Sequence, residues 1–227
     1  MPAPVVLVHG AFCGGWVFER FREPFEAAGH VVLSPDLRGH GPGGSTAGVG
    51  MRDYASDVAA LCKALPEPPI LIGHSMGGLV AQLAAAHAPL HALILLAPSP
   101  PWGVSGSSME EALAKRFSLD RMTREERRAV FARMVPESGL ALWQTLNWWL
   151  DPFMTTSVGR VAAPALVLAG GKDVIHPPAT ARQTAQRLGA RFETLPGMSH
   201  WIPGEPGWDE AAALCLDWLA SRDQAAA

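Results

Sequence analysis

Residues 71–78 read Leu71-Ile72-Gly73-His74-Ser75-Met76-Gly77-Gly78 and contain a Gly-x-Ser-x-Gly motif. An apolar run typical of a buried strand precedes the motif, and an Ala-rich helical pattern over residues 79–88 follows it. A serine placed on so sharp a turn between strand and helix projects its Oγ clear of the sheet. Gly73 and Gly77 lack the Cβ atoms that would collide in such a turn. The motif therefore predicts a nucleophilic Ser75; the alternative is a Gly-rich turn in which the serine only caps the helix.

The composition is that of one globular domain. The chain has 227 residues, of which 48% are hydrophobic, and this length can bury most of its unfolded surface in a single core. The formal net charge is −3, and no Lys/Arg-rich run indicates a nucleic-acid partner. No signal-peptide pattern or membrane-length apolar run is present. Cys13, Cys62 and Cys215 form no CxxC pair, so we expect free thiols and a cytoplasmic protein. From the charge and the absence of long apolar runs, we expect that it binds neither membranes nor nucleic acid.

Short apolar runs alternate with helical patterns along most of the chain. We expect buried strands at residues 4–8, 31–34, 70–72, 92–97 and 165–170, and a more polar edge strand at 191–195. We expect helices at residues 16–28, 53–65, 79–88, 178–188 and 208–220, the second of them capped by Asp53. Strands that are apolar throughout are typical of parallel sheets covered on both faces. The pattern predicts an α/β fold with a mostly parallel sheet of about six strands flanked by helices.

The alternation of short strands and helices stops after residue 99. The next strand begins only at residue 165, whereas ordinary connections are about 2–6 residues long. Helix starts are expected near Ser107 and at the capping box that begins at Thr123, and a third helix is expected over residues 140–150. We therefore predict a helical lid, inserted before the last two strands. The domain boundaries that follow are 1–99 and 161–227 for the core, and 100–160 for the lid.

Three candidate catalytic groups follow strands, in the order Ser, Asp, His. Ser75 ends the strand at 70–72, Asp173 follows the strand at 165–170, and His200 follows the edge strand. Catalytic groups in open parallel sheets gather at the carboxyl ends of the strands. A nucleophilic serine needs a base, and the base needs an orienting acid. The eight histidines show no HExxH or similar spacing, so we expect no metal and no cofactor.

Together these motifs resemble the α/β-hydrolase superfamily over nearly the whole chain, in a compact form that lacks the first two strands of larger members. The resemblance rests on His9-Gly10-Ala11, Gly73-His74-Ser75-Met76-Gly77, Gly171-x-Asp173 and His200. It implies the α/β-hydrolase fold and a triad in which Ser75 attacks an acyl carbonyl, His200 moves the proton and Asp173 orients the imidazole. It also implies an oxyanion hole formed by the N–H groups of Ala11 and Met76, with Phe12 as the alternative to Ala11.

Other polar residues near these motifs have structural interpretations. We expect His9 and His74 to hydrogen-bond the backbone and to shape the two loops of the oxyanion hole. His40 and Asp36 are expected to fix the loop that follows the second strand.

Aromatic side chains are the candidates for a substrate pocket. They are Phe12, Trp102, Trp143, Trp148, Trp149 and Trp201. The four tryptophans between residues 100 and 160 could equally form the core of the lid, so the sequence does not separate pocket-facing members from the rest.

The residues predict a serine hydrolase that cleaves a small ester, thioester or lactone with an apolar or aromatic part through an acyl-enzyme on Ser75. A serine at this position disfavours a dehalogenase or epoxide hydrolase, which needs a carboxylate nucleophile. Residues 8–16 resemble the opening of plant methylesterases and hydroxynitrile lyases, but Gly10 and Trp201 replace the Thr and Lys of the lyases. The alternatives are a C–C bond hydrolase or lyase that uses the same triad, and a ligand-binding receptor on the hydrolase scaffold.

Overall fold

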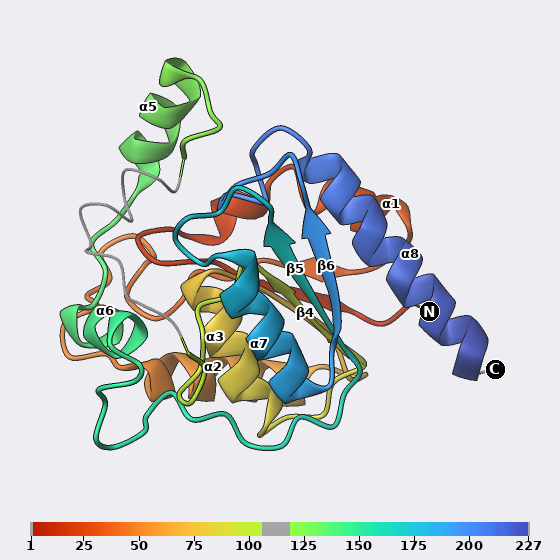
Figure 1. The fold of residues 1–227 in the computed structure, drawn as a ribbon, viewed down its shortest axis with the longest axis horizontal. Coiled ribbons are helices and arrows are strands. Elements are labelled where there is room, and N and C mark those ends of the chain that lie inside the picture. The colour runs from red at the N-terminus through yellow and green to blue at the C-terminus, as the bar shows by residue number, and fades with distance from the viewer. Residues whose placement is uncertain (1, 106–118, 227) are drawn as a thin grey trace.

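The computed structural model describes residues 2–105 and 119–226, and a six-stranded parallel sheet forms its centre (Figure 1). In spatial order the strands are β2 (Val32–Leu33), β1 (Val5–Val8), β3 (Ile70–His74), β4 (Ala92–Leu96), β5 (Ala165–Gly170) and β6 (Arg191–Leu195). Each neighbouring pair is parallel. The predicted α/β fold is confirmed, and the more polar β6 lies at an edge of the sheet as expected.

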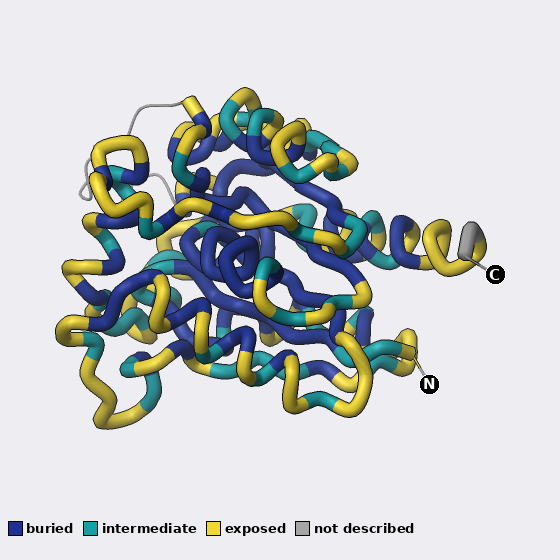
Figure 2. Tube along the Cα trace, turned by 90° about the horizontal axis from the view of Figure 1, so that it is seen from below, coloured by how far each residue is buried: buried dark blue, intermediate teal, exposed yellow. Residues whose placement is uncertain are grey.

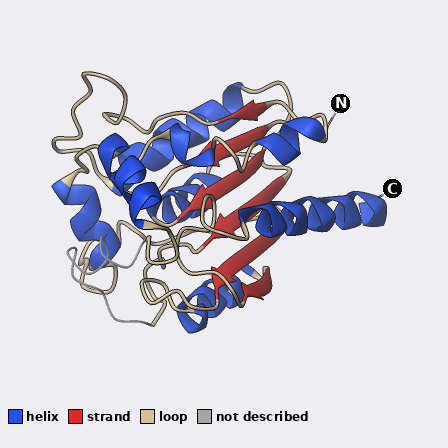
Figure 3. Cartoon of the chain, turned by 90° about the horizontal axis from the view of Figure 1, so that it is seen from above, coloured by secondary structure: helices blue, strands red, loops and turns tan. Residues whose placement is uncertain are grey.

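Helices cover both faces of this sheet (Figure 3). In chain order they are η1 (Gly15–Phe18, a 3₁₀ turn), α1 (Glu23–Ala27), α2 (Met51–Ala64), α3 (Met76–Ala85), α5 (Arg124–Arg133), α6 (Gly139–Leu146), α7 (Pro178–Leu188) and α8 (Trp208–Ala226). The boundaries of α7 match the sequence prediction.

Alternating strand residues build two cores, one on each face of the sheet. Leu7 and Ile72 pack on the side of α1 and α8, whereas Val8 and Leu71 pack on the side of α2, α3 and α7. Burial is concentrated at the centre of the molecule, and residues 221–224 of α8 are exposed (Figure 2). Every residue of α3 is buried, so the helix that begins beside Ser75 is held on all sides.

The chain order of the strands creates a crevice beside β1. From β1 the chain passes to β2 on one side, and β3 lies on the other side. Connections that leave in opposite directions open a crevice at the carboxyl ends of the strands, which is where ligands bind in such sheets. The loop that begins at His9, after β1, and the turn at Ser75, after β3, both lie at this crevice and contact one another through Gly10.

The helix predicted over residues 16–28 is wrong in its length. The structure has the short turn η1 followed by α1, which begins at Glu23. Pro24 explains the break, because a proline has no N–H to donate and its ring clashes with the carbonyl four residues earlier. Proline is tolerated in the first turn of a helix, and that is where it lies in α1.

Other helix ends also differ from the prediction, and α3 (Met76–Ala85) begins and ends three residues earlier than the predicted 79–88. Helix α2 begins at Met51, so Asp53 is not the cap itself but the third residue, whose carboxylate accepts the N–H of Gly50 at 2.8 Å. Helix α6 ends at Leu146 rather than at residue 150, and α8 continues to Ala226. The predicted helix start near Ser107 lies outside the described residues.

The segment between β4 and β5 (residues 97–164, the inserted segment) contains α5 and α6. The capping box predicted at Thr123 is present, because its hydroxyl accepts the N–H of Glu126 and that carboxylate accepts the N–H of Thr123. Figure 1 shows α5 standing away from the sheet, and α5 has no buried residue. Helix α6 instead packs against α2 and lies over the crevice.

Candidate active site

Ser75 occupies a strained turn between β3 and α3. Its backbone has φ of 53° and ψ of −122°, a conformation that residues other than glycine rarely adopt. A Cβ on Gly77 would lie 2.2 Å from the carbonyl oxygen of His9, and one on Gly73 would lie 2.4 Å from that of Gly77. Only glycine fits at either position, because α3 approaches β3 closely at Gly73 and the end of β1 closely at Gly77.

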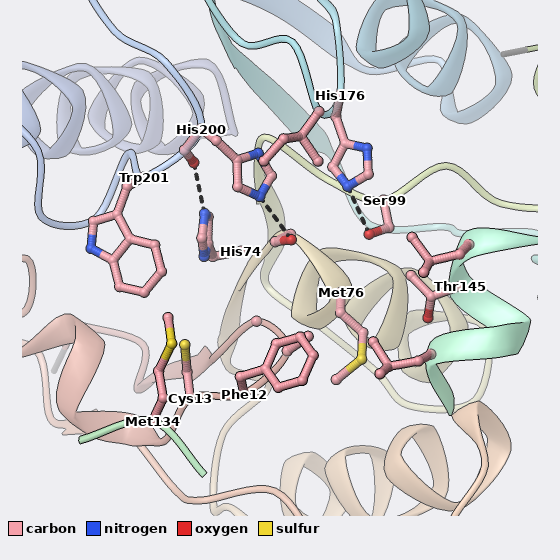
Figure 4. Close-up of a pocket in the computed structure, with 16 residues that line it drawn as sticks. Phe12, Cys13, His74, Met76, Ser99, Met134, Thr145, His176, His200 and Trp201 are labelled. Carbon is pink, nitrogen blue, oxygen red and sulfur yellow. Dashed lines mark hydrogen bonds between the residues drawn. The ribbon is translucent and has the colours of Figure 1, made fainter. Parts of the chain in front are cut away.

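The three residues predicted as a triad meet in the crevice, and Figure 4 shows His200 of this group at the cavity wall. His200 Nε2 lies 2.9 Å from Ser75 Oγ, and His200 Nδ1 lies 2.9 Å from Asp173 Oδ2. The other oxygen of Asp173 accepts the N–H groups of Ile175 and His176 at 2.8 and 3.0 Å. The carboxylate is thus fixed in the orientation that directs it toward the imidazole.

The environment of Asp173 favours its ionised form. Burial alone would raise the pKa of this carboxyl, but the charge and hydrogen bond of His200 and the neighbouring N–H groups hold the pKa below its ordinary value. Because the carboxylate accepts from Nδ1–H, Nε2 of His200 is left with a lone pair directed at the serine hydroxyl. This is the arrangement required of a general base.

Two further histidines flank His200. The ring centroids of His74 and His176 each lie 5.2 Å from that of His200. Burial lowers the pKa of both flanking rings to about 3, so both are neutral near pH 7. His74 Nε2 donates to the carbonyl oxygen of His200 at 2.8 Å, which fits the structural role predicted for it. The imidazole of His200 therefore lies between two neutral rings.

The loop after β1 (residues 9–13, the β1 loop) is held in one orientation by His9. His9 Nδ1 donates to the carbonyl oxygen of Gly10 at 2.8 Å, while its Nε2 accepts the N–H of Leu37 at 2.9 Å. The Gly10 carbonyl and the Ala11 N–H belong to one planar peptide unit and point in opposite directions. By fixing the carbonyl, His9 also orients the Ala11 N–H.

Donors for an oxyanion are available from two loops. Met76 is the first residue of α3, and its N–H is one of those at a helix start that have no partner within the helix. Ala11 and Met76 both line the cavity beside Ser75. The N–H of Phe12, in contrast, donates to the carboxylate of Glu137 at 3.3 Å. Of the two donors that the sequence left open in the β1 loop, this geometry favours Ala11.

The cavity beside Ser75 has two different sides (Figure 4). Toward Trp201 its wall is apolar and contains Cys13 and Met134. Toward His176 the wall contains two residues with hydroxyl groups, Ser99 and Thr145. Phe12 and Trp201, two of the aromatic residues that the sequence analysis named as pocket candidates, line this cavity.

The four other tryptophans proposed for the pocket do not line this cavity. Trp148 is buried, with its Nε1 donating to the carbonyl oxygen of Val104 at 2.9 Å. Trp143 and Trp149 are 46% and 40% exposed, and Trp102 lies outside the cavity wall. Helix α6 instead contributes Leu142, Thr145 and Leu146. These three lie on one face of the helix, at spacings of three and four residues, and Trp143 points about 100° away from Leu142.

Ser99 and His176 form a second hydroxyl–imidazole pair, which the sequence analysis did not identify. Ser99 Oγ lies 3.0 Å from His176 Nε2, and both residues line the cavity. The N–H of Ser99 donates to the carbonyl oxygen of Ser75 at 3.0 Å, so the pair is tied to the nucleophile turn. Position at a strand end was the available signal, because Ser99 follows β4 and His176 follows β5.

Comparison with known proteins gives the family. A model of the alpha/beta hydrolase family matches residues 5–214, so the chain belongs to that family. It is therefore an enzyme of the alpha/beta hydrolase class. The fold is also that of a thermophilic esterase from Thermogutta terrifontis, with a TM-score of 0.75 and 24% identity over 97% of this chain and 90% of that one.

Two curated relatives show the range of similar sequences. The magnesium-chelatase 30 kDa subunit of Rhodobacter capsulatus is 26% identical over 95% of this chain and 86% of that protein. Salicylic acid-binding protein 2 of Nicotiana tabacum is 35% identical, over 45% of this chain and 42% of that protein. Within the part of the chain that the structure describes, no helix is long and apolar enough to cross a bilayer.

Proposed function

We propose that this enzyme is a serine hydrolase that cleaves a small ester, thioester or lactone through an acyl-enzyme on Ser75. The observation that carries the proposal is the continuous chain of contacts from Asp173 through His200 to Ser75, with both distances at 2.9 Å. A base within hydrogen-bond reach of a hydroxyl, and itself oriented by a buried acid, is the arrangement that activates serine.

The proposed reaction has two halves. Ser75 Oγ bonds to the acyl carbon while its proton moves to His200 Nε2, and the Ala11 and Met76 N–H groups bind the resulting oxyanion. The bond to the leaving oxygen or sulfur then breaks, and His200 returns the proton to that atom. A water molecule, deprotonated by the same nitrogen, attacks the acyl-enzyme, and release of the acid restores the serine hydroxyl.

The cavity supports a substrate with an apolar or aromatic part. The side formed by Phe12, Cys13, Met134 and Trp201 can bury such a group next to the catalytic histidine. Two similar proteins support this chemistry: one is named pyrethroid hydrolase and the other polyneuridine aldehyde esterase, and they are 37% and 34% identical over about a third of the chain.

We also propose that residues 100–160 act as a lid on the core formed by residues 1–99 and 161–227. Residues from this segment complete the cavity wall, and apolar side chains there can exclude water from the oxyanion site. The three buried, free cysteines support a reduced, cytoplasmic environment.

A fluorophosphonate probe tests the proposal directly. The wild-type protein should be labelled on Ser75 and should turn over p-nitrophenyl esters many times per molecule, and both activities should be absent in Ser75→Ala. Labelling without turnover would instead support a ligand-binding receptor, and absence of both in the folded wild type would overturn the proposal.

A further inference from the structure

Glu137 lies on the inserted segment, far from the triad in sequence, yet its carboxylate contacts the core at several points. Its Oε1 accepts the Tyr54 hydroxyl at 2.7 Å and the Ser138 N–H at 2.8 Å. Its Oε2 accepts His40 Nε2 at 2.9 Å and the Phe12 N–H at 3.3 Å. Four donors occupy both oxygens, and the side chains of Glu137 and His40 are fully buried.

The partners of His40 indicate that this cluster is a buried ion pair. Its Nε2 faces the Glu137 carboxylate, and its Nδ1 lies 3.3 Å from the carbonyl oxygen of Arg38. Both neighbours are acceptors, so both ring nitrogens must donate and the ring is the imidazolium. Although burial opposes the charge, the carboxylate raises the pKa of His40 above its ordinary value. Loss of the Glu137 charge would therefore leave a buried cation without its partner.

The inserted segment binds Phe12 on both of its backbone groups. The Phe12 N–H donates to Glu137, and the Phe12 carbonyl accepts the N–H of Val135 at 2.9 Å. Phe12 also has φ of 64°, a conformation that is unfavourable for a bulky residue and that persists only where its surroundings impose it. The segment from Val135 to Glu137 supplies these restraints.

The position of Ala11 connects this contact to the proposed chemistry. Its own peptide N–H, the proposed oxyanion donor, is oriented by His9 through the carbonyl of Gly10. The next peptide unit, between Ala11 and Phe12, is held by Glu137. The peptide planes on both sides of the Ala11 Cα are thus fixed, one by the core and the other by the inserted segment. His40 packs against His9 with ring centroids 4.9 Å apart, which joins the two restraints.

We propose that Glu137 is a positioning residue, through which the inserted segment holds the β1 loop in the shape that binds the oxyanion. This inference rests on the proposed function of the Ser75 site. It assigns to one acidic side chain of the lid a part in transition-state stabilisation, in addition to any contact of the lid with substrate.

The test compares Glu137→Gln with Tyr54→Phe. Both variants remove hydrogen bonds from the same buried cluster. Only Glu137→Gln replaces a carboxylate oxygen, which accepts hydrogen bonds, by an NH₂ group that faces other donors. We expect kcat for a p-nitrophenyl ester to fall about 10- to 100-fold in Glu137→Gln with little change in KM, because misalignment of an oxyanion donor affects the transition state and not substrate binding. Tyr54→Phe should keep kcat within about threefold of the wild type.

A second readout separates positioning from a purely structural role. A trifluoromethyl ketone, which forms an oxyanion on the serine, should bind Glu137→Gln more weakly by about the same factor as kcat falls. A structural role would lower the thermal midpoint of both variants and leave kcat per folded molecule and ketone affinity unchanged, and that result would overturn the inference.

If Glu137→Gln does not fold, Glu137→Asp keeps the charge but retracts it from Phe12, and it should show the same loss of kcat. An inactive wild type would refute the proposed function, whereas an active wild type with an equally active Glu137→Gln would refute only the role of Glu137.

Discussion

The core and the inserted segment differ in how each contributes to the active site. Asp173 and His200 follow adjacent strands and are each 3% exposed, so the register of the sheet fixes their positions. The inserted segment contacts the cavity mainly through one face of α6, and it leaves Phe153 78% exposed. The comparison indicates that the reacting groups belong to the rigid sheet, whereas the inserted segment shapes the space around them.

The strongest test of the core's role is removal of the nucleophile. Ser75→Ala should reduce kcat by up to about 10⁶-fold, as expected when the serine of a triad is lost. The fold should persist, because alanine keeps the backbone hydrogen bonds of this position and, among the described residues, the serine side chain hydrogen-bonds only to His200. Steady-state hydrolysis and circular dichroism measure the two quantities. Substantial ester hydrolysis by the folded variant would place the nucleophile elsewhere.

The next largest effect should come from the acid. Asp173→Asn should reduce kcat by about 10⁴-fold, because the amide can donate to His200 Nδ1 and so favour the tautomer whose Nε2 carries the proton. A variant of Asp36 provides the control, because this acid follows β2 and its carboxylate accepts the N–H of Gly15 at 2.8 Å. Asp36→Asn should retain most of the activity. Wild-type kcat in Asp173→Asn would show that another acid orients His200.

The sequence predicted the core of this site better than it predicted the rest. Ser75, Asp173 and His200 each follow a strand that can be recognised in the sequence from its apolar residues or from its place in the alternation of strands and helices. A parallel sheet brings the carboxyl ends of these strands together, so the three residues could be predicted to meet. The contacts of His176 with Ser99 and of Glu137 with Phe12 join residues 77 and 125 positions apart, and no local pattern marks such pairs. In the inserted segment, the large tryptophan side chains were the sequence-based candidates for the pocket wall. The residues of α6 that face the cavity are instead Leu142, Thr145 and Leu146, which share one face of the helix.

The buried histidines of the core predict how stability depends on pH. Burial lowers the pKa of His176 to about 3, whereas its unfolded value is about 6.5. Between these values the unfolded chain binds a proton that the folded chain does not, so stability that is present above pH 6.5 is lost as the pH falls. From pH 7 to pH 5 this one residue should account for about 2 kcal/mol of the decrease in the free energy of unfolding.

Urea unfolding at the two pH values checks this number. His176→Gln can keep a hydrogen bond to Ser99 and should lose about 2 kcal/mol less than the wild type between pH 7 and pH 5. His91→Gln, at an exposed histidine whose only side-chain partner among the described residues is Asp223, should behave like the wild type. An unchanged pH dependence in His176→Gln would mean that this ring takes up its proton in the folded state.

The smallest expected effect tests what the inserted segment does. Leu142 lines the cavity, and its neighbour Trp143 is 46% exposed on another face of α6, so the two residues form a matched pair. Leu142→Ala should lower the ratio of kcat/KM for bulky over short esters about tenfold, because an apolar contact with the larger acyl or alcohol group is lost. Trp143→Ala should change that ratio by less than twofold, although it removes more apolar surface. If the tryptophan variant shifts the ratio as much as the leucine variant does, then α6 turns a different face to bound substrate. The division between a core that supplies the proposed reacting groups and an inserted segment that shapes the cavity and positions the β1 loop would then have to include movement of the segment.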